Sequence, residues 1–179
     1  EVYMNIRLVV IDAQEDFTRG ALYNHDAIKA LPTIRNIVDY ANKNRFSIFY
    51  TADTHDKDYM KTQRGKNLPM EHCIYNSPGW AICPEVAHGN NPIIITKNSF
   101  GTVEWEDWDL TIGSANEIYV CGFCTDICVI SNVLILKALY PEVPITVFEN
   151  ACAGVTPEKH AAALEVMKSC QINVERWDE

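Results

Sequence analysis

One segment of the chain places a cysteine where it can act as a nucleophile. An apolar run at residues 118–121 breaks at Gly122, and Cys128 follows a polar pair in the expected first turn of a helix. A helix N-terminus carries about half a positive charge and unpaired N–H groups, which favour the thiolate form of a cysteine. Cys128 is therefore a candidate nucleophile, placed like the serine of a nucleophile elbow. The alternative is a small apolar core residue, as free cysteines often are.

Two further side chains with acid–base chemistry follow the ends of other apolar runs. Asp12 ends residues 7–12, and Lys97 follows residues 93–96. Asp12 can accept the thiol proton and return it to a leaving amine, while Lys97 favours both the thiolate and the ionised aspartate. The backbone N–H groups of Cys124 and Cys128 can bind the oxyanion formed by attack on a carbonyl. This set suits amide hydrolysis through a thioester; a structural ion pair between Asp12 and Lys97 is the alternative.

The alternation of apolar runs with amphipathic segments predicts how these residues are positioned. Strands are predicted at residues 7–12, 46–51, 93–96, 117–121, 145–148 and 172–174, and helices at 32–44, 126–139 and 156–167. Pro32 is expected in a first helical turn, and residues 54–90 are expected to be mostly loop. The pattern predicts an α/β fold, a three-layer, Rossmann-like, mostly parallel sheet with helices on both faces. Ligands bind beyond the carboxyl ends of such strands, so Asp12, Asp53, Lys97 and Cys128 are expected at one edge.

Composition limits the class of protein. The chain has 179 residues and no repeat or linker, so residues 1–179 are expected to form a single domain. The net charge of −9 argues against binding to nucleic acid or an anionic membrane, and no apolar run matches a membrane helix. Seven cysteines without a recognisable export signal favour reduced thiols and a cytoplasmic location. The spacing of Cys121 and Cys124 also occurs in redox and zinc sites, but no second pair completes a zinc site.

Three motifs, in this order over nearly the whole chain, resemble the isochorismatase-like cysteine hydrolases. They are DAQEDF at residues 12–17, TKNSF at 96–100 and GFCTDICV at 122–129. Within that family they are most similar to the nicotinamidases, also called pyrazinamidases. The resemblance implies that Asp12, Lys97 and Cys128 form a catalytic triad. It further implies a small amide substrate, a role in NAD salvage and a homo-oligomer.

The same resemblance implies roles for four more residues. The cis peptide bond of the family falls between Phe123 and Cys124, where it would direct the Cys124 N–H into the oxyanion hole. Gln14 and Phe17 are expected to line the substrate pocket, with Phe17 against an aromatic ring. Cys124 stands where alanine is common, which puts a second thiol beside the nucleophile and makes oxidation a liability.

Nicotinamidases also bind a divalent metal, and its site is only partly matched here. Asp53, His55 and His72 match its ligands, and carboxylate and imidazole suit zinc, iron or manganese. Alternatively, the two histidines are solvated loop residues. The further histidine or glutamate ligand is absent between His55 and His72, where Asp58 remains a possible ligand and Arg64 stands near the expected glutamate. Arg64 can repel a cation or bind a substrate carboxylate.

Tryptophans mark a second departure from the nicotinamidase pattern. The tryptophan that often precedes the later histidine is missing, since residues 68–71 are LPME. Trp80 is a candidate for a ring supplied from elsewhere. Trp105 and Trp108 lie in an amphipathic stretch and are expected in the core, with an interface or a pocket wall as alternatives.

The leading hypothesis is therefore hydrolysis of nicotinamide to nicotinate and ammonia through a Cys128 thioester. One alternative is a metal-independent amidohydrolase of a ureido or N-carbamoyl acid, with Arg64 or Lys66 binding the carboxylate. Another is a noncatalytic scaffold or redox-sensing protein on this fold, with Cys128 as the sensor. A true isochorismatase is disfavoured because that chemistry lacks a cysteine nucleophile. A nucleotide-binding domain is disfavoured because no G-x-G-x-x-G turn follows the first strand.

Overall fold

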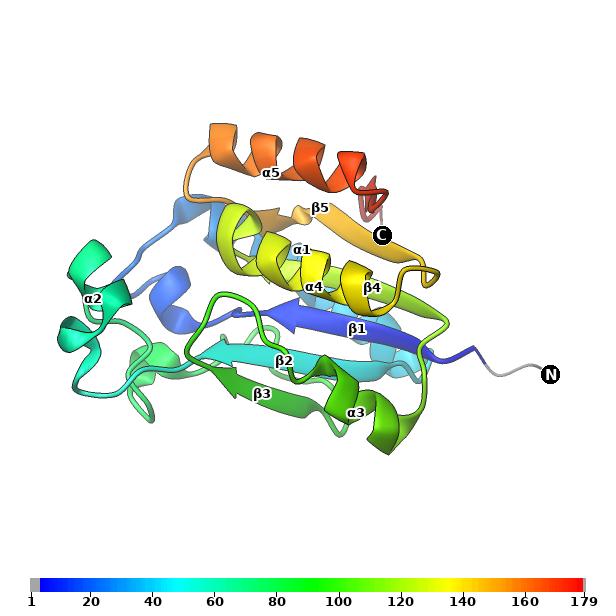
Figure 1. The fold of residues 1–179 in the computed structure, drawn as a ribbon, viewed down its shortest axis with the longest axis horizontal. Helices are drawn as coiled ribbons and strands as arrows, with labels where there is room; N and C mark the ends of the chain where they lie inside the picture. Colours follow the sequence, from blue (N-terminus) through cyan, green and yellow to red (C-terminus); the bar gives the residue numbers. More distant parts are fainter. Residues whose placement is uncertain (1–3, 179) are drawn as a thin grey trace.

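The computed structural model describes residues 4–178, which form a six-stranded parallel sheet flanked by helices (Figure 1). The strand order is β3-β2-β1-β4-β5-β6. The strands are β1 (Ile6–Ile11), β2 (Ser47–Asp53), β3 (Ile93–Lys97), β4 (Glu117–Phe123), β5 (Ile145–Ala153) and β6 (Asn173–Glu175). The helices are α1 (His25–Lys43), α2 (Gln63–Asn67), α3 (Trp105–Ile112), α4 (Ile130–Leu139) and α5 (Pro157–Ser169). Shorter turns are η1 (Glu15–Phe17), η2 (Tyr59–Lys61), η3 (Pro78–Trp80) and η4 (Thr125–Val129).

The sheet separates two apolar cores. One lies between the sheet and α1, and the other lies between the sheet and the helices α3, α4 and α5. Figure 1 shows α4 in front of the sheet and α1 behind it. Strands buried on both faces explain why the sequence gives nearly continuous apolar runs rather than alternation. The predicted three-layer, Rossmann-like α/β fold is confirmed.

The chain order brings the candidate catalytic residues to one edge of the sheet. After β1 the chain extends the sheet through β2 and β3, then returns to place β4 on the other side of β1. Ligands bind at such a reversal of strand order, beyond the carboxyl ends of the strands. Asp12 directly follows β1, Lys97 ends β3 opposite Asp53 at the end of β2, and η4 follows β4.

Helix α1 begins earlier than the sequence analysis predicts. Its N-terminal cap is Asn24, whose side chain accepts hydrogen bonds from the N–H groups of Asp26 and Ala27. Pro32 therefore lies inside the helix, not in its first turn. Proline removes one backbone hydrogen bond from a helix interior, but Pro32 lies on the exposed face, where water can compensate. The cap and the buried residues before Pro32 outweigh the cost.

The other boundaries agree closely, except that three strands run further than predicted. Strand β2 continues to Asp53, β4 to Phe123 and β5 to Ala153. The segment 54–90 is mostly loop, as expected, with short helical turns at η2, α2 and η3. No helix among residues 4–178 is long and apolar enough to cross a membrane.

The expectation for the α3 tryptophans is confirmed. Trp105 is 2% exposed and its ring meets the Phe49 ring edge-on, with 6.0 Å between centroids. Trp108 packs against the same core and the same phenylalanine, at 6.4 Å. Both rings therefore fix α3 to the sheet.

Candidate active site

A buried ion pair joins the ends of β1 and β3. Lys97 Nζ lies 2.7 Å from Asp12 Oδ2, and both side chains are buried. The Thr51 hydroxyl donates to Asp12 Oδ1 at 2.6 Å, and Lys97 also donates to the Ser99 carbonyl at 3.0 Å. Burial alone would lower the pKa of Lys97, but the negative charge of Asp12 raises it above its usual value. The ammonium therefore stays charged and is fixed against the carboxylate.

Thr51 is a member of the site that sequence analysis did not single out. It lies in β2 opposite Ile11, the last residue of β1, and its side chain is the second partner of Asp12. A hydroxyl near the carboxyl end of the buried strand that pairs with β1, beside a candidate catalytic carboxylate, is the signal that points to it. Thr51 orients Asp12 so that its other oxygen faces Lys97.

The candidate nucleophile lies beside this ion pair. Cys128 belongs to η4, a wide helical turn that leads into α4, and is 4% exposed. Burial raises the pKa of its thiol most, and the Asp12 charge and a hydrogen bond to Asp12 raise it further; Lys97 offsets only part, so the pKa is well above its usual value. The expectation that the helix terminus and Lys97 lower this pKa is therefore wrong. The raised pKa favours the protonated thiol beside the Asp12 carboxylate.

The turn that holds the nucleophile is fixed by its backbone. Gly122 has a φ of +120°, and a Cβ there would lie 2.0 Å from the last carbonyl oxygen of β1, so only glycine fits. The peptide bond between Phe123 and Cys124 is cis, as the resemblance implies. The Cys124 carbonyl accepts hydrogen bonds from the N–H groups of Ile127 at 3.0 Å and Val129 at 3.1 Å. The first helical turn is thereby tied to the residue that precedes it.

Cys128 faces a cavity of about 590 Å³. Its wall also includes Cys124, Phe17, His72 and Arg64, and mostly apolar side chains from residues 21–25, 68, 70, 127 and 155 complete it. Phe17 meets the His72 ring edge-on, with centroids 5.7 Å apart. A cavity of this size and lining is typical of small-molecule sites. It gives a substrate an apolar surface beside the thiol.

Gln14 does not line this cavity. Its side chain is fully buried, and Nε2 donates to the carbonyls of Asp53 at 2.9 Å and Trp80 at 2.8 Å. Its Oε1 accepts the Asp53 N–H at 2.8 Å. The expectation that Gln14 lines the substrate pocket is therefore wrong. The amide instead joins the end of β2 to the loop at η3.

Replacing Gln14 by leucine is expected to destabilise the fold by about 2–4 kcal/mol, because three backbone groups would lose their partner in a buried position. Guanidinium unfolding measures the change. Gln63→Leu, at an exposed residue of α2, is the matched control and should change stability little. Unchanged stability with a raised KM would instead show that Gln14 contacts the substrate.

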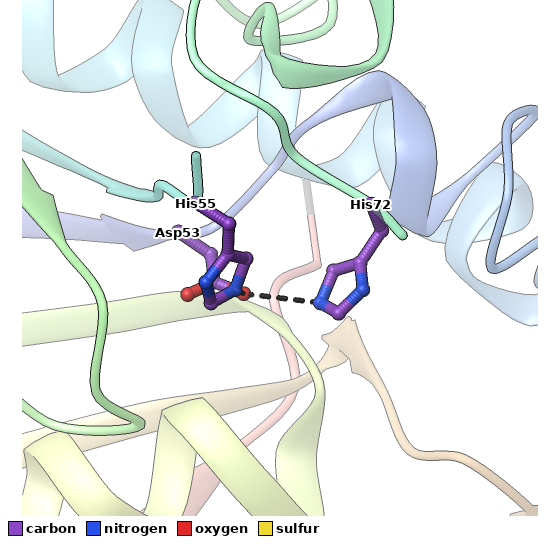
Figure 2. A group of neighbouring side chains, drawn as sticks. All are labelled: Asp53, His55 and His72. Atoms are coloured by element: carbon purple, nitrogen blue, oxygen red, sulfur yellow. Dashed lines mark hydrogen bonds and ion pairs between the residues drawn. The ribbon is translucent and has the colours of Figure 1, made fainter. Parts of the chain in front are cut away.

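A possible metal site adjoins the Asp12–Lys97 pair. One ligand atom each from Asp53, His55 and His72 lies within 4.8 Å of the others, and all three residues are buried. Asp53 Oδ2 lies 3.1 Å from His55 Nε2 and 3.4 Å from His72 Nε2. Figure 2 shows both rings beside the carboxylate. The alternative that the two histidines are solvated loop residues is wrong.

The donor set fits a divalent cation. His72 Nδ1 lies 2.8 Å from the Met70 carbonyl, and its Nε2 faces the Asp53 carboxylate, 3.4 Å from Oδ2. Metal-bound histidines commonly donate their other ring nitrogen to a backbone carbonyl in this way. Two imidazoles and a carboxylate suit zinc, iron or manganese.

Arg64 already occupies the carboxylate of this cluster. Its Nη1 donates to Asp53 Oδ1 at 3.0 Å, and its Nη2 donates to Oδ2 at 2.8 Å. Burial would raise the pKa of Asp53, but contacts with His55 and His72, the charge of Lys97 and the Arg64 hydrogen bond lower it well below its usual range. Asp53 is therefore ionised and paired.

Two other candidates lie apart from the site. Asp58 is exposed and pairs with Lys61 at 2.8 Å, and it does not belong to the Asp53 cluster. Trp80 does not line the cavity; its indole N–H donates to the Thr54 hydroxyl at 2.8 Å, and its ring meets Tyr75. The tryptophan missing before His72 therefore has no replacement in Trp80.

The fold agrees with a comparison against known protein families. Residues 7–179 match the sequence model of the isochorismatase domain. The chain therefore belongs to the isochorismatase family and is a hydrolase of that family. A comparison with curated protein sequences finds no significant match.

Solved structures with the same fold include several amidases. The nicotinamidase/pyrazinamidase of Bacillus subtilis is 24% identical, with a TM-score of 0.85 over 97% of this chain and 100% of that chain. The zinc complex of the Pyrococcus horikoshii pyrazinamidase is 26% identical, with a TM-score of 0.84 over 97% of this chain and 99% of that chain. The N-carbamoylsarcosine amidase of Thermoplasma acidophilum is 20% identical, with a TM-score of 0.80 over 98% of each chain.

Proposed function

We propose that this chain is a cysteine amidohydrolase that deamidates a small carboxamide, with nicotinamide as its substrate and nicotinate and ammonia as products. The observation that carries the proposal is the buried Asp12–Lys97 pair beside the Cys128 thiol, which faces a mostly apolar cavity. These groups supply a nucleophile, a base and a fixed positive charge. Such an activity would serve NAD salvage.

Proton transfer and attack are coupled in the first step. The Cys128 thiol gives its proton to the Asp12 carboxylate as sulfur attacks the amide carbon, so no free thiolate need accumulate. Lys97 stabilises the negative charge that moves from Asp12 onto sulfur and then onto the substrate oxygen. The raised pKa of Cys128 suits this coupling, because a thiolate of high proton affinity is a strong nucleophile.

The backbone of the turn receives the oxyanion. The N–H groups of Cys124 and Cys128 are its proposed donors, and the hydrogen bonds to the Cys124 carbonyl hold the turn in place before substrate binds. Asp12 then returns the proton to the leaving nitrogen, which departs as ammonia and leaves a thioester on Cys128. Asp12 next takes a proton from a water that attacks the thioester, which releases the carboxylic acid and restores the thiol.

The substrate ring is placed against Phe17 and His72, which line the cavity with the nucleophile. Asp53, His55 and His72 would hold the metal. When bound there, a metal supplies a Lewis acid that can bind a ring nitrogen of the substrate.

The experiment is ammonia release from purified protein with nicotinamide and pyrazinamide, assayed with and without added zinc or manganese. Metal-dependent turnover of both amides supports the proposal. Protein that leaves both amides unchanged at saturating concentration, with metal supplied, contradicts it.

A second candidate function is hydrolysis of an N-carbamoyl or ureido acid without metal. Arg64 favours it, because it lines the cavity and its guanidinium can exchange the Asp53 carboxylate for that of a substrate. Similarity of fold to the Thermoplasma acidophilum amidase adds support. The same assay separates the two functions: turnover of only the acidic substrates, unaffected by chelators, selects this candidate.

A further inference from the structure

We propose that Arg64 is a built-in competitor for the metal site, so that its guanidinium and a divalent cation are alternative partners of the Asp53 carboxylate. This inference rests on the metal site of the proposed function. It predicts that the cation must displace Arg64 from Asp53 in order to bind tightly.

The first argument is that Arg64 uses the oxygen a cation needs. Both imidazole Nε2 atoms of the cluster face Asp53 Oδ2, at 3.1 Å from His55 and 3.4 Å from His72. Arg64 Nη2 donates to that same oxygen at 2.8 Å, and Nη1 takes the other carboxylate oxygen at 3.0 Å. The paired geometry thus covers both oxygens of the only carboxylate in the cluster.

The second argument is the charge balance of the site. The carboxylates of Asp12 and Asp53 face two cations, Lys97 and Arg64, and the four groups sum to zero. Because these four charges already balance, a divalent cation bound at Asp53 would add two positive charges to a buried region. Such an excess is costly at low dielectric, and displacement of Arg64 toward solvent removes part of it.

The third argument is that Arg64 has room to move. It is the residue shared by the linings of the Cys128 cavity and of a second hollow of about 300 Å³. Its side chain is 21% exposed, and it has two partners outside the cluster, the Asn98 carbonyl at 3.3 Å and the Phe100 ring, 4.5 Å from the guanidinium carbon. The guanidinium can therefore leave Asp53 by rotation of a long side chain.

The opposite role makes the opposite prediction. If Arg64 only orients Asp53 as a metal ligand, its loss would weaken metal binding about 10–100-fold, as is typical of residues that support a ligand. If Arg64 competes with the cation, its loss strengthens metal binding. The sign of the change in affinity therefore decides between the roles.

The experiment measures Zn²⁺ affinity of the metal-stripped protein by chelator competition, with no assay of activity. We expect Arg64→Gln to bind Zn²⁺ at least about tenfold more tightly than wild type, because one competing cation is removed. Lys66→Gln, at an exposed residue two positions along α2, is the matched control and should stay within about twofold. His72→Gln should lose the tight binding, which assigns it to this site.

Equal or weaker Zn²⁺ binding by Arg64→Gln would overturn the proposal, as would tight binding that His72→Gln leaves intact. Arg64→Lys keeps the charge but not the paired geometry, so an affinity between those of wild type and Arg64→Gln supports competition. The zinc result is independent of the amidase assay. If the protein lacks carboxamidase activity but Arg64→Gln binds zinc more tightly, the proposed function is contradicted and this inference is kept.

Discussion

Replacing Cys128 by alanine is expected to reduce kcat/KM for carboxamide hydrolysis by at least about 10⁴-fold, since the covalent route needs this sulfur and removal of a nucleophile typically has an effect of that size. The folded state should persist, because the change removes one sulfur atom from a residue that borders a cavity. Ammonia release by wild type and variant, with circular dichroism as a check of folding, measures the effect.

Cys124→Ala is the matched control, because Cys124 lines the same cavity through a thiol that the mechanism does not use. It keeps the backbone N–H proposed for the oxyanion hole, so its activity should remain within about tenfold of wild type. Mass spectrometry of acid-quenched wild type should detect an acyl adduct on the peptide containing Cys128. Comparable activity in Cys128→Ala, or an adduct on Cys124, would show that the nucleophile is misassigned.

Much of the fold follows from the sequence because strands buried on both faces give unmistakable apolar runs. Each run ends at or near a polar residue that the parallel order must bring to one edge, which is why Asp12, Lys97 and Cys128 are found together. The start of α1 was harder to predict. A proline inside the helix looks like a helix start, and only the Asn24 cap, eight residues before the predicted start, fixes the true one.

The roles of individual site residues are harder to predict, because the same residue type can serve several purposes. Gln14 stands in a catalytic motif, but its amide binds backbone groups of two segments that are far apart in sequence, which no local pattern reveals. Arg64 was expected either to repel a cation or to bind a substrate carboxylate, but the structure pairs it with the Asp53 carboxylate. The thiol pKa of Cys128 was misjudged because burial and the adjacent carboxylate outweigh the helix terminus and Lys97. All three properties depend on contacts between residues that are far apart in the sequence.

The second large expected effect comes from substitutions in the buried Asp12–Lys97 pair. They measure separately what the pair contributes to stability and to catalysis. Lys97→Met leaves a buried carboxylate without its cation, and Asp12→Asn leaves a buried ammonium without its anion. Each single variant is expected to be destabilised by about 3–5 kcal/mol, the usual result of breaking a buried pair by removing one partner. Each should also lose at least about 10³-fold in kcat/KM, because the proton acceptor or the fixed charge is gone.

The double variant Asp12→Asn, Lys97→Met removes both charges together, so most of the lost stability should return while activity stays absent. Guanidinium unfolding and ammonia release measure the two quantities on the same preparations. Lys61→Met, at an exposed ion pair with Asp58, is the control and should change neither. A double variant that regains activity along with stability would reduce the pair to a structural support. Recovery of stability alone would show that two buried charges are kept at the sheet edge for the chemistry of Cys128.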